Sequence, residues 1–412
     1  MDFNDSPQEA AFRAEARAWL EDNAERKGPG KVYRYKRGEP ELIPAARAWE
    51  ERKFEGGFSG IALPQEFGGR GETRLQQIIF AEEEADYLIP PAVFSISHGM
   101  AVPTLLTYAT EEQKQRYVPA TLRGDEIWCQ MFSEPAGGSD LAGLRTRSVR
   151  DGDADDADWI INGHKIWTSG AHYADMAILV TRSDPDAPKH KGLTYFFLDM
   201  KSPGIEVRPI RQISGYSNFN EVFMTDLRIP DAQRLGDVGQ GWQVAITTLM
   251  NERVSSGVRP APDFEDIFDL VRMTELENGP AIADGAIREK LADWYIKAQG
   301  VKLIRARLMT ALSRGERPGP ENSVSKLVSA FRRQEIAHFG MDLLDMGGGM
   351  VDPDLAPMRA MYQQALLDAP GGRIAAGSDE ILRNIISERV LGLPPDIRVD
   401  KELPFDQLPS GR

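Results

Sequence analysis

The chain has 412 residues, of which 41% are hydrophobic and 27% charged, so we expect two or three globular domains. Its formal net charge of −14 disfavours nucleic acid and anionic membrane surfaces as partners, because both attract the opposite sign. Cys129 is the only cysteine, which excludes an intrachain disulfide.

The first residues are acidic and lack the apolar segment of a signal peptide. No apolar run approaches the ~20 residues that span a bilayer. We therefore expect a cytoplasmic protein that does not bind a membrane.

Residues 1–125 are expected to form an α-helical domain. Ser6-Pro7 is a typical helix start, and the spacing of apolar residues predicts helices over 72–89 and 111–122. Thr110 and Gln113 have the spacing of a capping box, in which each side chain satisfies a free backbone N–H of the other residue.

Residues 126–235 are expected to form a β domain. Asn162-Gly163 lies between two apolar runs, a pattern that predicts a hairpin with a type I′ turn. Further strands are expected at 176–181, 193–198, 205–210 and 221–227. Short strands separated by Gly, Pro and Asp favour a small barrel or sandwich.

Residues 236–400 are expected to form a helical bundle, followed by a surface tail at 401–412. Asn322 is interpreted as the N-cap of a helix, and residues 257–285 look irregular because of their prolines and glycine. Other long helices are expected at 284–313, 356–368 and 378–391. Several long helices in succession suggest an antiparallel four-helix bundle, so the fold class is α+β multidomain.

Two glycine-rich segments are candidates for a ligand site. Residues 128–140 read WCQMFSEPAGGSD, and residues 162–170 read NGHKIWTSG. Glycines let a ligand approach the backbone, and Trp167 offers a flat apolar face. Taken alone, either segment is better explained as a turn of the β domain with a tryptophan in its core.

Together, however, these segments resemble the signature of acyl-CoA dehydrogenases: Ser-Glu-Pro, small residues and Gly-Ser-Asp, then Asn-Gly-x-Lys-x-Trp. Residues 60–71 (GIALPQEFGGRG) and 377–393 (GSDEILRNIISERVLGL) extend the resemblance over nearly the whole chain. It implies FAD as cofactor, bound between the β domain and the bundle. It also implies oxidation of an acyl-CoA thioester to a 2-enoyl-CoA.

The resemblance also implies roles for individual residues. It places Trp167 against the flavin face, Thr168 and Ser169 near N5, and Ser139 beside the CoA portion of the substrate. It places four residues at the pyrimidine side of the ring: Gln130, Met131, Phe132 and Ser133.

Two C-terminal segments are further candidates for cofactor contacts. Gly348 lies in a glycine-rich turn that resembles one touching a neighbouring subunit's FAD; a helix stop explains it equally well. Ser378 and Glu380 open the last helix, where free N–H groups either bind a polar ligand or are simply capped.

The catalytic base departs from the pattern of many family members, which have a Glu just before the C-terminal signature. This chain has Ala376 there. Some members instead place the Glu on an earlier helix, directly before an Arg, and here Glu252-Arg253 matches them. We expect Glu252 to be the general base, Arg253 to be a substrate contact, and the backbone N–H of Ala376 to bind the thioester oxygen. The alternative is a Glu at the rim of the bundle without a catalytic role.

Other features leave alternatives open. The family's Arg-x-x-Phe-Gly motif is missing, and Arg272 is either its substitute or a surface arginine. We expect a homodimer or homotetramer that passes electrons to an electron-transferring flavoprotein. Alternatives are a hetero-oligomer in which this chain is a non-catalytic or half-site subunit, and an acyl-CoA oxidase, although the chain is short for that relative. The five histidines lack metal-ligand spacing, so no metal is expected.

Overall fold

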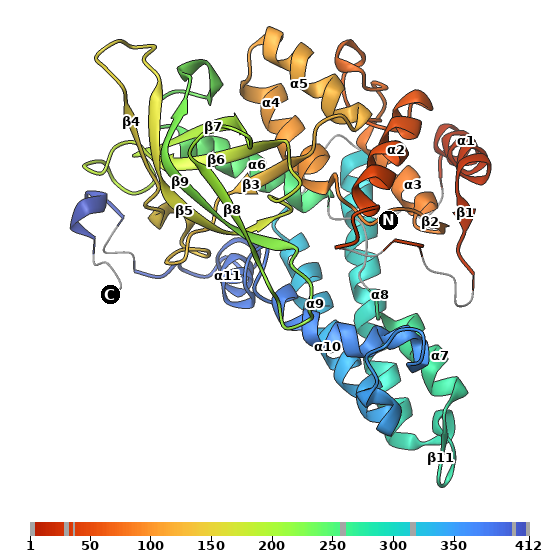
Figure 1. Cartoon of the computed structure of the whole chain (residues 1–412). Helices are drawn as coiled ribbons and strands as arrows, with labels where there is room; N and C mark the ends of the chain where they lie inside the picture. The colour runs from red at the N-terminus through yellow and green to blue at the C-terminus, as the bar shows by residue number, and fades with distance from the viewer. Residues whose placement is uncertain are drawn as a thin grey trace. The chain divides into compact units, whose positions relative to one another are not determined.

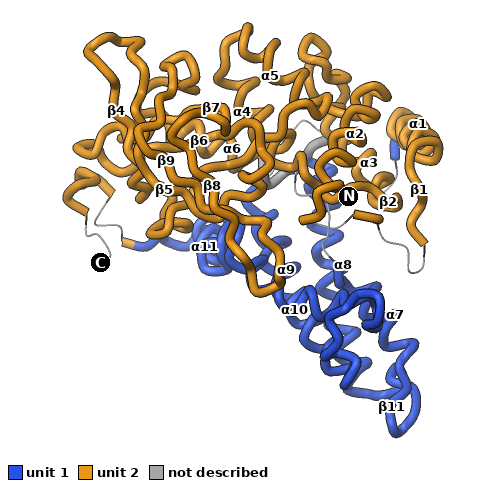
Figure 2. Tube along the Cα trace, viewed as in Figure 1, with its two compact units in different colours: residues 1–6, 258–396 blue, residues 7–257, 397–412 orange. Residues whose placement is uncertain are grey.

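The computed structural model describes residues 5–28, 33–35, 38–255, 261–313, 319–397 and 401–408. Side chains are not described at 252–255 and 312–313. The chain forms two compact units. The first unit in chain order consists of residues 7–257 with 397–412 and is drawn in orange, as unit 2, in Figure 2. The second consists of residues 1–6 with 258–396 and is drawn in blue, as unit 1.

The first unit begins with a series of helices. They are α1 Pro7–Asn23, α2 Leu42–Glu55, α3 Arg74–Glu84, α4 Val102–Tyr108 and α5 Glu111–Arg123, with a π-helical turn at Ser97–Ala101 and a two-stranded ribbon of β1 Glu25–Arg26 and β2 Tyr87–Leu88. The predicted capping box at Thr110 is confirmed, and Thr73 with Gln76 forms a second one. The predicted helices at 72–89 and 111–122 correspond to α3 and α5.

An eight-stranded sheet follows, with the order β10-β7-β6-β4-β5-β9-β8 and with β3 also paired to β6 (Figure 1). Its strands are β3 Trp128–Met131, β4 Arg147–Arg150, β5 Trp159–Ser169, β6 Met176–Arg182, β7 Leu193–Asp199, β8 Ile205–Ile210, β9 Phe219–Ile229 and β10 Arg234–Leu235. One edge of β6 is shared: β3 pairs with Met176–Leu179, and β4 pairs at Arg182. The sheet therefore branches at β6.

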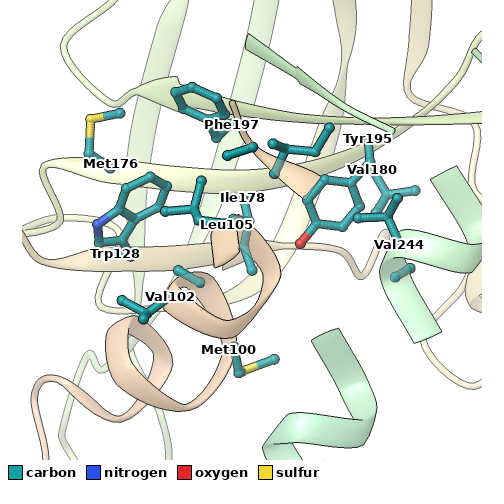
Figure 3. Close-up of a cluster of buried hydrophobic side chains, with 14 of the residues drawn as sticks. Met100, Val102, Leu105, Trp128, Met176, Ile178, Val180, Tyr195, Phe197 and Val244 are labelled. Carbon is teal, nitrogen blue, oxygen red and sulfur yellow. The ribbon is translucent and has the colours of Figure 1, made fainter. Parts of the chain in front are cut away.

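Strand alternation divides the sheet's side chains between two cores. Trp128, Tyr195 and Phe197 belong to a cluster that includes residues of α4, α5 and α6 (Gly241–Ser255), part of which Figure 3 shows. Cys129 and Phe196, their neighbours along the strands, belong instead to a cluster with β5 and β9. Period-two alternation of this kind buries both faces of β3, β6 and β7.

The predicted hairpin at Asn162-Gly163 is wrong, because β5 runs without interruption from Trp159 to Ser169. A Cβ on Gly163 would lie 2.4 Å from Thr146 Oγ1, so glycine is needed for close strand approach. Asn162 exchanges hydrogen bonds with Asp226 on β9, beside a shift in register between the two strands. The pair therefore marks a bulge in a continuous strand.

The second unit is helical, with α7 Phe264–Met273, α8 Gly285–Ser313, α9 Asn322–Leu343, α10 Met361–Gly372 and α11 Asp379–Ile385, a π-helical turn at Ile386–Val390, and a short ribbon of β11 Glu275–Leu276 and β12 Gly279–Pro280. The interpretation of 257–285 as irregular missed α7. Asp263 caps that helix in a capping box with Asp266, and Ile267 and Val271 enter the core. The predicted N-cap at Asn322 is also wrong: Asn322 is the first residue of α9, and Glu321 occupies the cap position without a side-chain cap bond.

Candidate functional site

Trp167 projects from a distorted part of β5. Its φ is +58°, which is unusual for a bulky residue, and it lies where the register between β5 and β9 shifts. The residue is 55% exposed, with the ring of Phe219 edge-on at 6.0 Å. Trp167 is therefore not a core tryptophan. The strand instead holds a large apolar face outward, at a backbone cost on the order of 1–3 kcal/mol.

A buried ion pair fixes the strand just before this distortion. Lys165, fully buried, donates to Glu134 Oε1 at 2.8 Å and to the carbonyl of Phe132 at 3.1 Å. The backbone N–H groups of Arg145 and Thr146 donate to the same carboxylate at 2.6 and 2.8 Å. Glu134 thus connects β5 with the end of β3 and the start of β4.

Electrostatics favour the charged form of Glu134. Burial opposes ionisation, but the Lys165 charge and the hydrogen bonds hold the pKa of Glu134 below its ordinary value. Sequence reasoning missed this pair. The sequence feature that could have revealed the pair is the position of Lys165 in an alternating strand. Ile161, Gly163 and Lys165 are spaced two residues apart and therefore face the same, inward side.

The segment expected at the pyrimidine side of a flavin has its apolar side chains occupied by the protein. Met131 is buried in one core, and Phe132 packs edge-on against Tyr195 in the other. Gln130 and Ser133 are partly exposed. A ligand could therefore contact the backbone of Met131 and Phe132 and the side chains of Gln130 and Ser133, but not the side chains of Met131 and Phe132.

Thr168 and Ser169 follow Trp167 on β5. Thr168 is buried, and its hydroxyl has no hydrogen-bond partner among the described residues. Its carbonyl accepts from the side chain of Asn220 at 2.9 Å. Ser169 is partly exposed and pairs with Phe219. A buried hydroxyl without a partner beside an exposed tryptophan is what an incoming polar ring would satisfy.

Ser139, expected at the CoA portion of a substrate, is exposed in the loop after β3. After Asp140, a short 3₁₀ turn, Leu141–Gly143, follows. The loop is thus anchored at both ends, by Glu134 on one side and by this turn on the other.

Glu252 and Arg253 lie in α6, and their side chains are outside what the structure describes. One turn earlier, the buried hydroxyl of Thr248 bonds to Tyr195 of β7 at 3.0 Å and to Thr104 of α4 at 2.8 Å. Position 252 follows Thr248 by four residues and so continues the same face of the helix. Buried hydroxyls therefore hold this face of α6 against the sheet.

In the second unit, Gly348 is buried in a 3₁₀ turn, Asp345–Gly349, after α9. A Cβ there would lie 2.7 Å from the carbonyl of Met341, so close packing requires glycine. The left-handed residue after the helix is Asp345, with φ of +47°.

The last helix starts after two left-handed residues, Ala376 (φ +52°) and Gly377 (φ +90°), and Ala376 is exposed. Ser378 caps the helix by accepting from the N–H of Ile381 at 3.5 Å. Glu380 is exposed, and hydrogen bonds to its own backbone N–H and to Ser378 lower its pKa.

Arg272 is exposed, as is expected of a surface arginine. Its guanidinium carbon lies 5.9 Å from the centre of the Phe268 ring.

In the part of the chain that the structure describes, no helix is long and apolar enough to cross a membrane. No group of three or more His, Cys, Asp or Glu side chains is placed to hold a metal ion within that same part.

Family models match three consecutive parts of the chain. The acyl-CoA dehydrogenase N-terminal domain matches residues 6–125, the middle domain residues 129–228, and the C-terminal domain residues 239–391.

Individual relatives carry the same family name. Acyl-CoA dehydrogenase FadE34 of Mycobacterium tuberculosis is 41% identical over 328 residues, which are 79% of this chain but 43% of that protein. The chain thus spans less than half the length of FadE34. Acyl-CoA dehydrogenase IpdE1 of Mycolicibacterium smegmatis is 36% identical over 402 residues, 94% of this chain and 98% of the relative.

Solved structures share the fold. One titled Tcur3481-Tcur3483 steroid ACAD has a TM-score of 0.77 and 26% identity, covering 96% of this chain and 100% of that one. The ChsE4-ChsE5 complex from Mycobacterium tuberculosis has a TM-score of 0.76, also at 26% identity with 96% and 100% coverage.

Proposed function

Because this chain belongs to the acyl-CoA dehydrogenase family of flavin-dependent oxidoreductases, we propose that it converts an acyl-CoA thioester to the 2-enoyl-CoA. One observation carries the proposal: the exposed, strained Trp167 next to the buried hydroxyl of Thr168, which has no partner among the described residues. The comparison with IpdE1 over nearly the whole of both chains supports it.

The residues present fit FAD. Trp167 would cover one face of the isoalloxazine, and Ser133, Thr168 and Ser169 would offer polar groups to its edge. Backbone groups of Met131 and Phe132 would complete the contact, since their side chains are buried. Bound FAD supplies the acceptor, at N5, for the hydride that leaves the β carbon.

This chain's own residues would perform the proton chemistry. The carboxylate of Glu252 takes the α proton, and the backbone N–H of Ala376 donates to the thioester oxygen, where negative charge develops. Alanine at position 376 retains that N–H although it cannot act as a base. Arg253 would contact the substrate beside the base. Gly348 would contact the FAD of a neighbouring subunit, and Ser378 and Glu380 would contact the cofactor at the start of the last helix. An electron-transferring flavoprotein is the proposed acceptor of the electrons, with oxygen, as in an oxidase, as the alternative.

The acyl group is proposed from the relatives. A structure with 26% identity is titled a steroid ACAD, so a steroid-derived thioester belongs in the substrate panel beside straight, branched and aromatic acyl-CoAs. Activity with an artificial electron acceptor across this panel identifies the class.

The test of the base is Glu252→Gln, which keeps the shape of the side chain and removes its basicity. Mixed anaerobically with the best substrate of the panel, the variant should bleach the flavin ~10²–10⁴-fold more slowly than the wild type. FAD content and acyl-CoA binding should be unchanged. Glu289→Gln, at an exposed position of α8, is the matched control and should bleach normally. Bleaching of Glu252→Gln at the wild-type rate would mean that another group supplies the base.

A second candidate is a half-site or non-catalytic subunit of a heteromeric enzyme. Ala376 at the usual position of the base favours it, and a structure similar to this chain is a complex of two different proteins, ChsE4 and ChsE5. In that case the purified chain alone would never bleach with any acyl-CoA of the panel, and bleaching would appear only with a second protein present.

A further inference from the structure

The segment 401–408 packs against the sheet of the first unit, with which Figure 2 groups it. Pro404 forms an isolated bridge with Pro188 in the connection between β6 and β7. The N–H groups of Phe405 and Asp406 donate to the carbonyls of Ala187 and Pro185 at 3.0 and 3.1 Å. Backbone bonds therefore hold the main chain at Phe405 against this connection.

Phe405 covers a buried arginine. The guanidinium carbon of Arg182 lies 3.8 Å from the centre of the Phe405 ring, and Arg182 is only 3% exposed. Burial lowers the pKa of Arg182 to about 10, against the attraction of Glu134, Asp140 and Asp184. An aromatic face is a favourable cover for a guanidinium removed from water.

Arg182 in turn holds the loop that carries Ser139. Its Nη2 donates to the carbonyl of Ala142 at 2.5 Å and to that of Leu144 at 3.4 Å, so it binds the middle of the 3₁₀ turn after Ser139 and the residue that directly follows this turn. Its Nη1 donates to the carbonyl of Lys189 at 2.8 Å. The side chain of Lys189 reaches Asp140, the residue next to Ser139, at 3.3 Å.

We propose that Phe405 and Arg182 are positioning residues for the Ser139 loop, through which the tail strengthens binding of the CoA portion of the substrate. This inference rests on the proposed function. Without the Phe405 ring, water reaches the guanidinium and competes for the carbonyls of Ala142 and Leu144. The turn then loosens, and Ser139 loses its fixed position, whereas Trp167 and α6 keep theirs.

The test compares Phe405→Leu, which keeps apolar bulk but loses the aromatic face, with Phe405→Tyr, which keeps that face. Phe405→Leu should raise the KM for the best acyl-CoA and the Kd for CoA itself about tenfold. The kcat and the FAD content should stay at wild-type values, and Phe405→Tyr should behave as the wild type. A loss confined to kcat, or an unchanged KM, would overturn the proposal.

Two further variants separate positioning from general stability. Asp406→Pro removes the N–H that donates to Pro185 while leaving the ring in the chain, and should raise KM as Phe405→Leu does. Gln407→Ala, at an exposed position of the same turn, is the matched control and should not.

A double-mutant cycle tests the route through Ser139. If the tail acts through this loop, Phe405→Leu with Ser139→Ala should raise KM no more than Ser139→Ala alone; simple additivity would contradict the route. If the wild type turns over no acyl-CoA of the panel, the proposed function is refuted. If the wild type is active and Phe405→Leu has the same KM, only the role of the tail is refuted.

Discussion

Single residues carry the chemistry, and Trp167 is the one whose geometry is most unusual. Neither the positive φ of Trp167 nor the exposure of its side chain contributes to packing in the core of the sheet. Trp167→Ala should weaken FAD binding by about 2 kcal/mol, roughly thirtyfold in Kd, because the ring contact is lost. Trp167→Phe keeps an aromatic face and should retain most of the flavin. The flavin content of the purified variants is the measurement, and full retention with an unchanged flavin spectrum in Trp167→Ala would show that the residue does not touch the ring.

At the same scale, Lys165 and Glu134 should matter for stability. Lys165→Met leaves the carboxylate of Glu134 buried without its cation, which should lower the free energy of unfolding by about 3–5 kcal/mol. Adding Glu134→Gln removes the stranded charge and should recover part of that loss. Urea unfolding of the two single variants and the double variant measures it. Strict additivity of the single effects would show that the two side chains do not act as a pair.

At the scale of elements, α1 and α3 are joined by a charged contact. Glu83 of α3, buried, accepts from Arg17 at 2.8 Å and from Arg13 at 3.1 Å, and the hydrogen bond from Arg17 is the main cause that lowers the pKa of Glu83. A carboxyl whose folded pKa lies below its unfolded value of ~4.5 stabilises the fold above that pH. The contribution is lost as the pH falls through the lower, folded pKa.

Glu83→Gln should therefore lower the free energy of unfolding by about 2 kcal/mol at pH 7. The difference from the wild type should shrink steadily below about pH 4.5, because the wild-type carboxyl becomes protonated. Urea unfolding at pH 7, 5, 4 and 3 measures it. A difference that does not depend on pH would mean that packing, and not charge, joins the two helices.

At the scale of the whole molecule, the surface around the glycine-rich turn predicts an oligomer. Met346 and Val351, on either side of Gly347–Gly349, are 89% and 72% exposed, which suits a face covered by another subunit. We propose a closed homodimer or homotetramer, or a hetero-oligomer of related chains. Light scattering should give at least twice the chain mass of 45.8 kDa. A monomer that retains FAD would refute this prediction, and a different protein that co-purifies would indicate the heteromer.

The sequence by itself determined what depends on near neighbours and on composition. The capping box of Thr110 with Gln113, the strands at 176–181 and 193–198 and the long helix at 284–313 followed from spacing alone, because their hydrogen bonds and buried faces repeat within a few residues. The signature segments also indicated the family, since their residue types and order are specific.

Only the tertiary structure decided the features that join distant parts of the chain. The dipeptide Asn162-Gly163 by itself favours a turn. In the fold it stays within a strand, because Gly163 packs closely against Thr146 and Asn162 bonds to Asp226 beside the bulge. These tertiary contacts outweigh the local preference for a turn. The outward direction of Trp167 depends on the register with β9, and Lys165 meets Glu134 across 31 residues. Phe405, near the C-terminal end of the chain, covers Arg182, which lies in the middle of the sequence at the end of β6. Which distant residues pair in charge or cover one another is a property of the packed fold, so a local pattern does not identify the partner.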